Sequence, residues 1–201
     1  MNNCLVAITG ASGAIIGIRL IEELLKNRID VIAIISKNGR NVLHAELGAD
    51  FPLPANVHYF SEGDENSPFN SSSFVLDAMV VAPCSMKTLA GIANGFSFNL
   101  IVRAAEIQLR TNRPLILSPR ETPLSAPNLK NMLDVKNAGA LICPPMAAYY
   151  HRPASVDDMT NFFVGKILDL LGIPNTLYQR WQNKQPGSII RTDDPPKNQE
   201  Q

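Results

Sequence analysis

The sequence has few of the features that would recruit a polyanion, a membrane or a metal. Its 18 basic and 18 acidic residues give a formal net charge of +0, so the overall charge favours neither nucleic acid nor an anionic membrane as a partner. No apolar run reaches the roughly 20 residues that cross a bilayer. The three His residues are scattered and the three Cys residues lack the spacing of zinc ligands, so we expect no metal site.

Cysteine is scarce and odd in number. Cys4, Cys84 and Cys143 all lie in apolar surroundings, which predicts reduced and mostly buried thiols rather than disulfides. The chain passes almost directly from Met1 into an apolar segment, so we expect no signal peptide. These features favour a cytoplasmic protein.

The signatures of the commonest dinucleotide enzymes are also missing. Gly10, Gly13 and Gly17 follow the pattern Gly-x-x-Gly-x-x-x-Gly rather than Gly-x-Gly-x-x-Gly. The second apolar segment, residues 30–36, is followed by Lys37 instead of an acidic residue that would bind a ribose hydroxyl. No Tyr has a Lys four positions later. A mononucleotide phosphate, such as that of FMN, therefore fits this chain better than NAD.

What the sequence does contain is a strand, a glycine turn and a helix at its start. Residues 5–8 are apolar and short enough for a buried strand, residues 9–13 form a tight turn, and apolar residues then follow at helical spacing. Such a turn presents backbone N–H groups and a helix N-terminus to a phosphate. Ser12 either caps the helix or binds a phosphate oxygen. The alternative is a plain connection without a ligand.

Strands and helices alternate along the whole chain. The predicted strands are 5–8, 30–36, 57–60, 77–83, 114–118 and 140–143, and the predicted helices after the first are 38–47, 84–94, 99–111, 126–136 and 155–171. This order predicts an α/β fold, a Rossmann-like doubly wound parallel sheet between two layers of helices. We expect a single FMN-binding domain over residues 1–182, and a polar tail over 183–201 that packs on a neighbouring subunit.

Three polar turns follow predicted strands, at residues 10–13, 83–88 and 119–123. Ligands of doubly wound sheets bind outside the carboxyl ends of the strands, so these turns should converge on one site. Further along the chain, Tyr150 and Trp181 either form an aromatic wall of such a site or pack in the core.

The densest basic stretch contains Arg120, Arg103 and Arg110. Arg120 lies at a strand end between prolines, where an anchored guanidinium suits a bidentate contact with phosphate. Arg103 and Arg110 are seven residues apart and so share one face of their helix. Ser85 and Thr88 begin another helix, where they either cap it or bind a ligand.

In combination, these segments resemble the UbiX-type flavin prenyltransferase family. The matching segments are Thr9-Gly-Ala-Ser-Gly13, Val81-Ala-Pro-Cys-Ser-Met-Lys-Thr-Leu89, Asn99-Leu with Arg103-Ala-Ala, Arg113-Pro-Leu-Ile-Leu-Ser-Pro-Arg-Glu-Thr-Pro-Leu124, Asn131-Met-Leu, Pro144-Pro145, Tyr150 and Arg180-Trp181. The resemblance implies a homododecamer of Rossmann-like subunits that bind FMN. It implies transfer of a dimethylallyl group from dimethylallyl phosphate to N5 and C6 of reduced FMN, without a metal. The product would serve a UbiD-type decarboxylase.

The same resemblance assigns roles to individual residues. Those implied to bind the cofactor are Gly10, Ala11, Ser12, Ser36, Ser85, Met86, Lys87, Thr88 and Arg120. Those implied to bind the prenyl phosphate are Arg103, Arg110, Tyr150 and Lys166. Those implied to act in catalysis are Ser12, Glu46, Glu121, Tyr150 and Trp181.

Four positions depart from the family pattern. Arg110 stands where the family usually has Lys, and Lys166 stands where it usually has Arg. We expect both to face the prenyl phosphate with Tyr150 beside them. Phe98 replaces an Asp or Asn, and Ser72 replaces the Gly of a turn beside the flavin.

Two other functions compete with prenyl transfer. One is an FMN-dependent cysteine decarboxylase, but such enzymes need a Pro-x-Met-Asn segment and residues 144–147 read Pro-Pro-Met-Ala. The other is a flavin-binding protein without prenyl transfer, if the exchanges at Arg110 and Lys166 abolish the chemistry.

Overall fold

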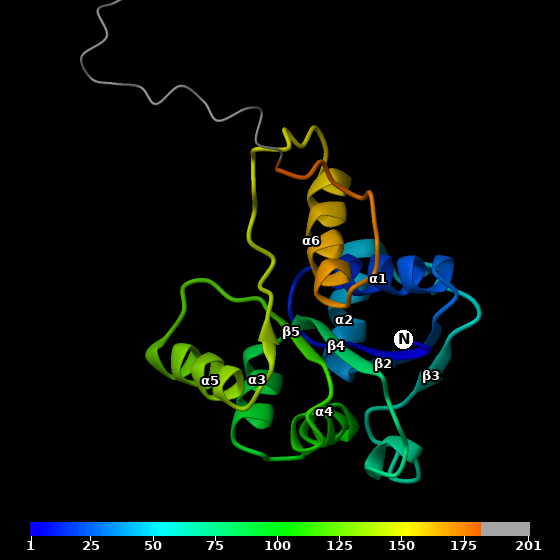
Figure 1. The fold of residues 1–201 in the computed structure, drawn as a ribbon, viewed down its shortest axis with the longest axis vertical. Helices are drawn as coiled ribbons and strands as arrows, with labels where there is room; N and C mark the ends of the chain where they lie inside the picture. Colours follow the sequence, from blue (N-terminus) through cyan, green and yellow to red (C-terminus); the bar gives the residue numbers. More distant parts are fainter. Residues whose placement is uncertain (182–201) are drawn as a thin grey trace, which may run out of the picture.

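The computed structural model describes residues 1–181, so the predicted packing of the tail at 183–201 lies outside the described residues. Six parallel strands form one sheet in the order β3-β2-β1-β4-β5-β6 (Figure 1). The strands are β1 Asn3–Ile8, β2 Asp30–Ile35, β3 His58–Phe60, β4 Ala78–Cys84, β5 Leu115–Pro119 and β6 Leu141–Ile142. The predicted doubly wound parallel sheet is confirmed.

Helices cover both faces of this sheet (Figure 1). The helices on one face, which pack around the first of them, are α1 Ala14–Lys26, α2 Lys37–Leu47 and α6 Val156–Leu170. The helices on the other face are α3 Met86–Ala93, α4 Leu100–Arg110 and α5 Ala126–Asn137. A short 3₁₀ turn, Pro68–Asn70, packs against α4. None of the helices in residues 1–181 combines the length and apolarity needed to cross a membrane.

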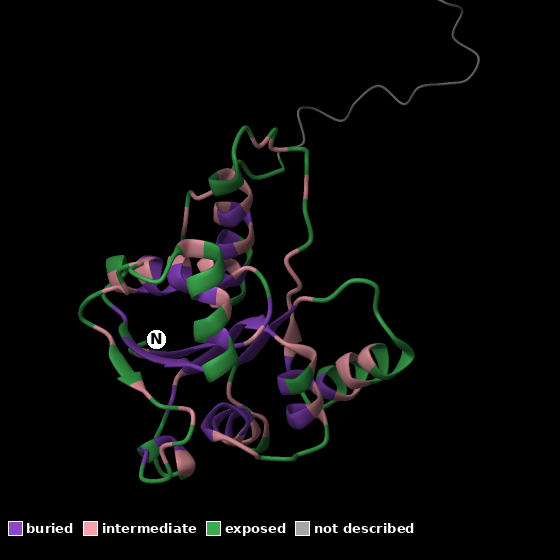
Figure 2. Cartoon of the chain, turned by 180° about the vertical axis from the view of Figure 1, so that it is seen from behind, coloured by how far each residue is buried: buried purple, intermediate pink, exposed green. Residues whose placement is uncertain are grey.

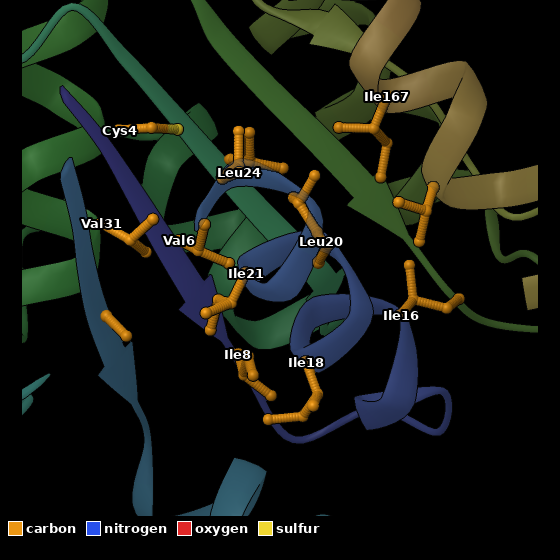
Figure 3. Packing of buried hydrophobic residues seen from close by; sticks show 14 of the residues in the cluster. Cys4, Val6, Ile8, Ile16, Ile18, Leu20, Ile21, Leu24, Val31 and Ile167 are labelled. Carbon is orange, nitrogen blue, oxygen red and sulfur yellow. The ribbon is translucent and has the colours of Figure 1, made fainter. Parts of the chain in front are cut away.

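The sheet divides the core into two hydrophobic clusters. Side chains alternate along each strand, so Val6 and Ile8 of β1 point to α1 while Leu5 and Ala7 point to the opposite cluster. Both faces of the central strands are buried, which explains their continuous apolar runs (Figure 2). Figure 3 shows α1 packed between the sheet and Ile167 of α6.

The order of the strands reverses between β1 and β4, and the turns that follow these two strands are hydrogen-bonded to each other. The Thr9 hydroxyl donates to the Pro83 carbonyl at 2.8 Å and accepts from the Ser85 N–H at 2.8 Å. The Thr9 N–H also donates to the Pro83 carbonyl, at 3.2 Å. Hydrogen bonds therefore join the two turns that form the floor of the crevice between β1 and β4, where the strand order reverses.

Two predicted helices begin later than expected because serines cap them. Cys84 is still part of β4 and pairs with Pro119, so α3 begins at Met86 with Ser85 as its N-cap. Ser155 is the N-cap of α6, and its hydroxyl accepts from the Asp158 N–H while the Asp158 carboxylate accepts from the Ser155 N–H. This reciprocal pair is a capping box, which satisfies N–H groups at the start of the helix.

Candidate functional site

The three polar turns do converge, as predicted. They border a cavity of about 590 Å³ at the carboxyl ends of β1, β4 and β5. Its lining consists of Gly10, Ala11, Ser12, Asn38, Val42, Ala45, Glu46, Ser85, Met86, Lys87, Arg120 and Glu121. We call this the large cavity.

A smaller cavity of about 250 Å³ shares part of this lining. Its residues are Gly10, Ser36, Lys37, Asn38, Glu62, Ser85, Lys87, Thr88, Phe98 and Asn99. We call this the small cavity. Every residue that the sequence assigned to cofactor binding lines at least one of the two cavities.

Two helices begin at the small cavity, and a serine caps each of them. The Ser36 hydroxyl accepts from the Gly39 N–H at 2.9 Å at the start of α2. At the start of α3, the Ser85 hydroxyl accepts from the Thr88 N–H at 3.4 Å and lies 3.1 Å from the Thr88 hydroxyl. The first-turn N–H groups of a helix lack partners within the helix and carry partial positive charge. This cavity is therefore suited to an anion.

The N-terminus of α1 is arranged differently. Its N-cap is Gly13, in the left-handed conformation with φ of 96°, and the Ser12 side chain makes no capping bond. The Glu46 carboxylate of α2 accepts instead from the N–H groups of Gly13 and Ala14 at 3.0 Å. Of the two roles considered for Ser12, helix capping is therefore wrong, because a carboxylate from another helix already occupies that position.

Arg120 is anchored through its backbone while its side chain faces the large cavity. Its N–H donates to the Cys84 carbonyl at 3.1 Å, which ties the end of β5 to the end of β4. Its Nε atom is buried and makes no hydrogen bond within residues 1–181. A buried guanidinium N–H without an acceptor is costly, so this geometry favours an anionic or carbonyl ligand there.

Arg103 lies in a third cavity of about 490 Å³, which adjoins the small cavity at Lys87, Phe98 and Asn99. Its guanidinium donates to Glu106 at 2.8 Å and to the Asn70 carbonyl at 3.3 Å. Arg103 is therefore close to the predicted cofactor site but already paired within its own chain.

Tyr150 and Trp181 belong to an aromatic cluster at α6, which Phe162 and Tyr178 extend to Lys166. The rings of Tyr150 and Trp181 meet edge to face at 5.4 Å, and the Lys166 ammonium lies 5.9 Å from the centre of the Tyr178 ring. Burial, together with the hydrogen bond from its hydroxyl to Asp169 at 2.6 Å, raises the pKa of Tyr178 to about 12. None of these residues lines the large or the small cavity.

Arg110 lies apart from both groups. It ends α4, on the opposite face of the sheet from α6, and its side chain is exposed. The sequence had predicted that Arg110, Tyr150 and Lys166 share one phosphate site. Within a single chain Arg110 does not lie next to the other two.

Several residues that line the two cavities were not predicted from the sequence, including Asn38, Val42, Ala45, Glu62 and Asn99. The first three lie on α2, after the predicted cofactor-binding residue Ser36, and their spacing along one helical face was the available signal. Glu62 comes from the irregular segment after β3, where no periodic pattern exists. Three or more His, Cys, Asp or Glu side chains that could hold a metal ion do not come together anywhere in residues 1–181.

Comparison with known proteins finds relatives that match most of the chain. The flavoprotein family model matches residues 1–168. The flavin prenyltransferase UbiX of Methanocaldococcus jannaschii is 47% identical over 179 residues, which are 88% of this chain and 97% of that protein. The flavin prenyltransferase UbiX of Pseudomonas aeruginosa is 40% identical over 194 residues, 88% of this chain and 92% of that protein.

Solved structures show the same likeness. AnUbiX (PadA1), crystallised with FMN and dimethylallyl pyrophosphate, has a TM-score of 0.85 and 38% identity over 90% of this chain and 97% of that one. A dodecameric FMN-dependent UbiX-like decarboxylase from Escherichia coli O157:H7 has a TM-score of 0.84 and 36% identity over 90% of this chain and 99% of that one. A PPC decarboxylase mutant shares only the fold, with a TM-score of 0.62 and 21% identity over 86% of this chain and 99% of that one.

Proposed function

The chain belongs to the flavoprotein family and, within it, to the UbiX-type flavin prenyltransferases, and we propose that the large and small cavities together hold its FMN. The enzyme transfers a dimethylallyl group from dimethylallyl phosphate to reduced FMN, whose N5 and C6 atoms are the nucleophiles. The observation that carries the placement is the meeting of three strand-end turns around Arg120, whose buried Nε has no acceptor within residues 1–181.

We assign the FMN phosphate to the small cavity. Hydroxyl groups of Ser36, Ser85 and Thr88 line it, the helices α2 and α3 begin there, and Lys87 adds a positive charge. This assignment differs from the position expected from the sequence at residues 10–13, because Glu46 already binds the N–H groups at the start of α1. In this assignment Arg120 and the turn at 10–12 hold the remainder of the cofactor.

The two carboxylates of the large cavity have different surroundings. Both oxygens of Glu46 accept backbone N–H groups, so its position is fixed by the fold. Glu121 accepts from the Thr122 N–H at 2.9 Å through Oε1 only, within residues 1–181. We assign to Glu121 the acceptance of a proton through Oε2, and to Glu46 and Ser12 the positioning of the reactants. The donors of this cavity are in place before substrate arrives, as electrostatic stabilisation of charge requires.

The prenyl phosphate side needs more than one copy of the chain. Tyr150 and Trp181 are 40% and 72% exposed, and they lie with Lys166 away from the cavities of their own chain. We propose that the protein forms a homododecamer, and that this aromatic cluster reaches the large cavity of a neighbouring subunit, with Arg103 and Arg110 contributing from further copies. Electron-rich rings then face the developing allyl cation, while the cationic side chains bind the leaving phosphate. Exclusion of water protects the cation.

We further propose that the protein works in the cytoplasm and passes its prenylated flavin to a UbiD-type decarboxylase. Prenyl transfer is tested by incubating the purified protein with FMN and dimethylallyl phosphate under anaerobic, reducing conditions. Mass spectrometry should detect a flavin heavier by one dimethylallyl group, and a sample kept oxidised serves as the control. Binding of FMN without any prenylated product would leave only a flavin-binding protein. Release of carbon dioxide from a cysteine-containing peptide without prenyl donor would indicate a decarboxylase.

A further inference from the structure

Lys87 lies where several cavities of the protein adjoin. It is the second residue of α3, it lines the large, small and third cavities, and it also borders an apolar surface hollow beside Phe96 and Phe98. Its ammonium forms no ion pair with a carboxylate within residues 1–181. It lies instead 4.6 Å from the centre of the Phe98 ring. An aromatic face attracts an ammonium ion without neutralising its charge.

Two features set the position of the Phe98 ring. It packs against α3 at Gly91, where a β-carbon would come within 2.7 Å of the ring, so a larger residue there would displace it. The backbone beside the ring is fixed as well, because the next residue, Asn99, is the N-cap of α4 and its side chain accepts from the Val102 N–H at 3.0 Å. The position of the ring below Lys87 is thus set by the packing of α3 and by the start of α4.

The same short segment also binds an acidic side chain, Glu62, that shares two cavities with Lys87. Glu62 lines the small and third cavities together with Lys87, yet its two oxygens accept from the Lys37 N–H and the Asn99 side-chain amide, at 2.6 and 2.7 Å. Its carbonyl accepts from the Leu100 N–H at 2.9 Å. Phe98 therefore holds a cation and Asn99 holds an anion, and the two opposite charges at one cavity do not pair.

We propose that Phe98 is a positioning residue for flavin binding, which keeps the Lys87 ammonium apart from Glu62 and directed to the cofactor phosphate. This inference rests on the proposed function, in which Lys87 binds that phosphate. Without the ring, Lys87 is free to pair with Glu62, and a paired ammonium contributes less to binding an anion. The effect should therefore depend on the ligand having a phosphate and on residue 87 having a charge.

The test measures the affinity of the flavin-depleted full-length chain for FMN and for riboflavin, which lacks the phosphate. Phe98→Leu should weaken FMN binding about threefold, as expected for loss of a partly exposed cation–π contact, and leave riboflavin binding unchanged. Phe98→Trp, which keeps an aromatic face, should bind FMN like the unchanged chain. Phe96→Leu is the matched control, because Phe96 borders the same surface hollow but, within residues 1–181, Lys87 makes its cation–π contact with Phe98 and not with Phe96.

Lys87→Met separates this inference from the assignment on which it rests. It should weaken FMN binding roughly tenfold or more, and Phe98→Leu should have no further effect in the Lys87→Met background. If Lys87→Met leaves FMN affinity unchanged, the assigned phosphate site fails and the inference with it. If Lys87→Met weakens FMN but Phe98→Leu does not, or weakens riboflavin equally, only the role of Phe98 is overturned. Circular dichroism of each variant confirms that it is folded.

Discussion

The Glu46 carboxylate accepts hydrogen bonds from the backbone N–H of Gly13 with both of its oxygens, each at 3.0 Å. The two residues are 33 positions apart, so the contact ties α2 to the first turn of α1. It places a carboxylate against the positive end of a helix, where such a charge is stabilising. A proposed catalytic residue is thus also the cap of the helix that carries the cofactor turn.

The first prediction is that Glu46 stabilises the free protein. Glu46→Ala removes the only side-chain cap that the structure describes for α1, and should lower the free energy of unfolding by about 1 kcal/mol. Thermal unfolding without flavin measures this change. Glu22→Ala is the control, since Glu22 makes a partly exposed ion pair with Arg19 on the same helix and caps no helix end, so its loss should cost less. Equal melting temperatures for the two variants would contradict the capping role.

The second prediction concerns Arg120. Arg120→Ala should weaken FMN binding by about 1.5–3 kcal/mol, because the proposed charged hydrogen bond from the guanidinium to the cofactor is lost. Quenching of flavin fluorescence on binding provides the measurement. Arg113→Ala is the matched control, because that half-buried side chain lines neither cavity and, within residues 1–181, donates to the Phe74 carbonyl. Retention of flavin by Arg120→Ala at the level of the control would count against the placement.

The third prediction separates the prenyl donor from the cofactor. Lys166→Ala should raise the apparent KM for dimethylallyl phosphate and leave FMN affinity almost unchanged, because the residue lies outside both cavities of its own chain. Lys166→Arg should be tolerated, since the positive charge remains. Steady-state kinetics with a flavin titration of each variant decides the matter. Normal turnover by Lys166→Ala would make it an ordinary surface lysine.

The fourth prediction is that α1 packs so tightly on the sheet at Gly17 that it cannot shift to accommodate a larger residue. A β-carbon at Gly17 would clash with the Ala82 carbonyl oxygen and lie 2.6 Å from the Ile8 side chain. Gly17→Ala should therefore destabilise the fold by about 1–3 kcal/mol through overpacking. Gly63→Ala is the comparison, because the nearest atom there is 4.0 Å away. Urea unfolding of the two variants should differ clearly, and similar midpoints would disprove the tight packing.

The fifth prediction is a loss of stability in alkali. Burial raises the pKa of the Cys4 thiol from 9.0 to about 12, with a smaller contribution from Asp77, and burial raises that of Cys84 equally. Between those values the unfolded chain releases thiol protons that the native chain retains, so the free energy of unfolding falls as pH rises from 9 towards 12. Unfolding curves across this range should show a shallower decline for Cys4→Ala. An identical slope would rule out the linkage.

Local patterns predicted the sheet because its central strands are buried on both faces and read as unbroken apolar runs. They also predicted the convergence of the three turns, which follows from parallel strands ending at one edge. The contact of Glu46 with Gly13 was beyond such patterns, because it depends on how α2 packs on α1. The separation of Tyr150 from Arg110 was equally hidden, since sequence spacing does not say on which face of the sheet each helix packs.

The bonded floor between Thr9, Pro83 and Ser85 has a consequence for how this enzyme can change. The two sides of the crevice are already hydrogen-bonded to each other, so they lose little conformational entropy when a ligand binds. Most of the entropic cost of ordering the site arises during folding instead. Retention of the flavin then depends mainly on turns that are shared with the core. In the proposed arrangement, substitutions in the exposed segment after β6, or on α6, alter which allylic donor is accepted while the flavin stays bound. Flavin binding and selectivity for the prenyl donor can therefore evolve at different rates in the same chain.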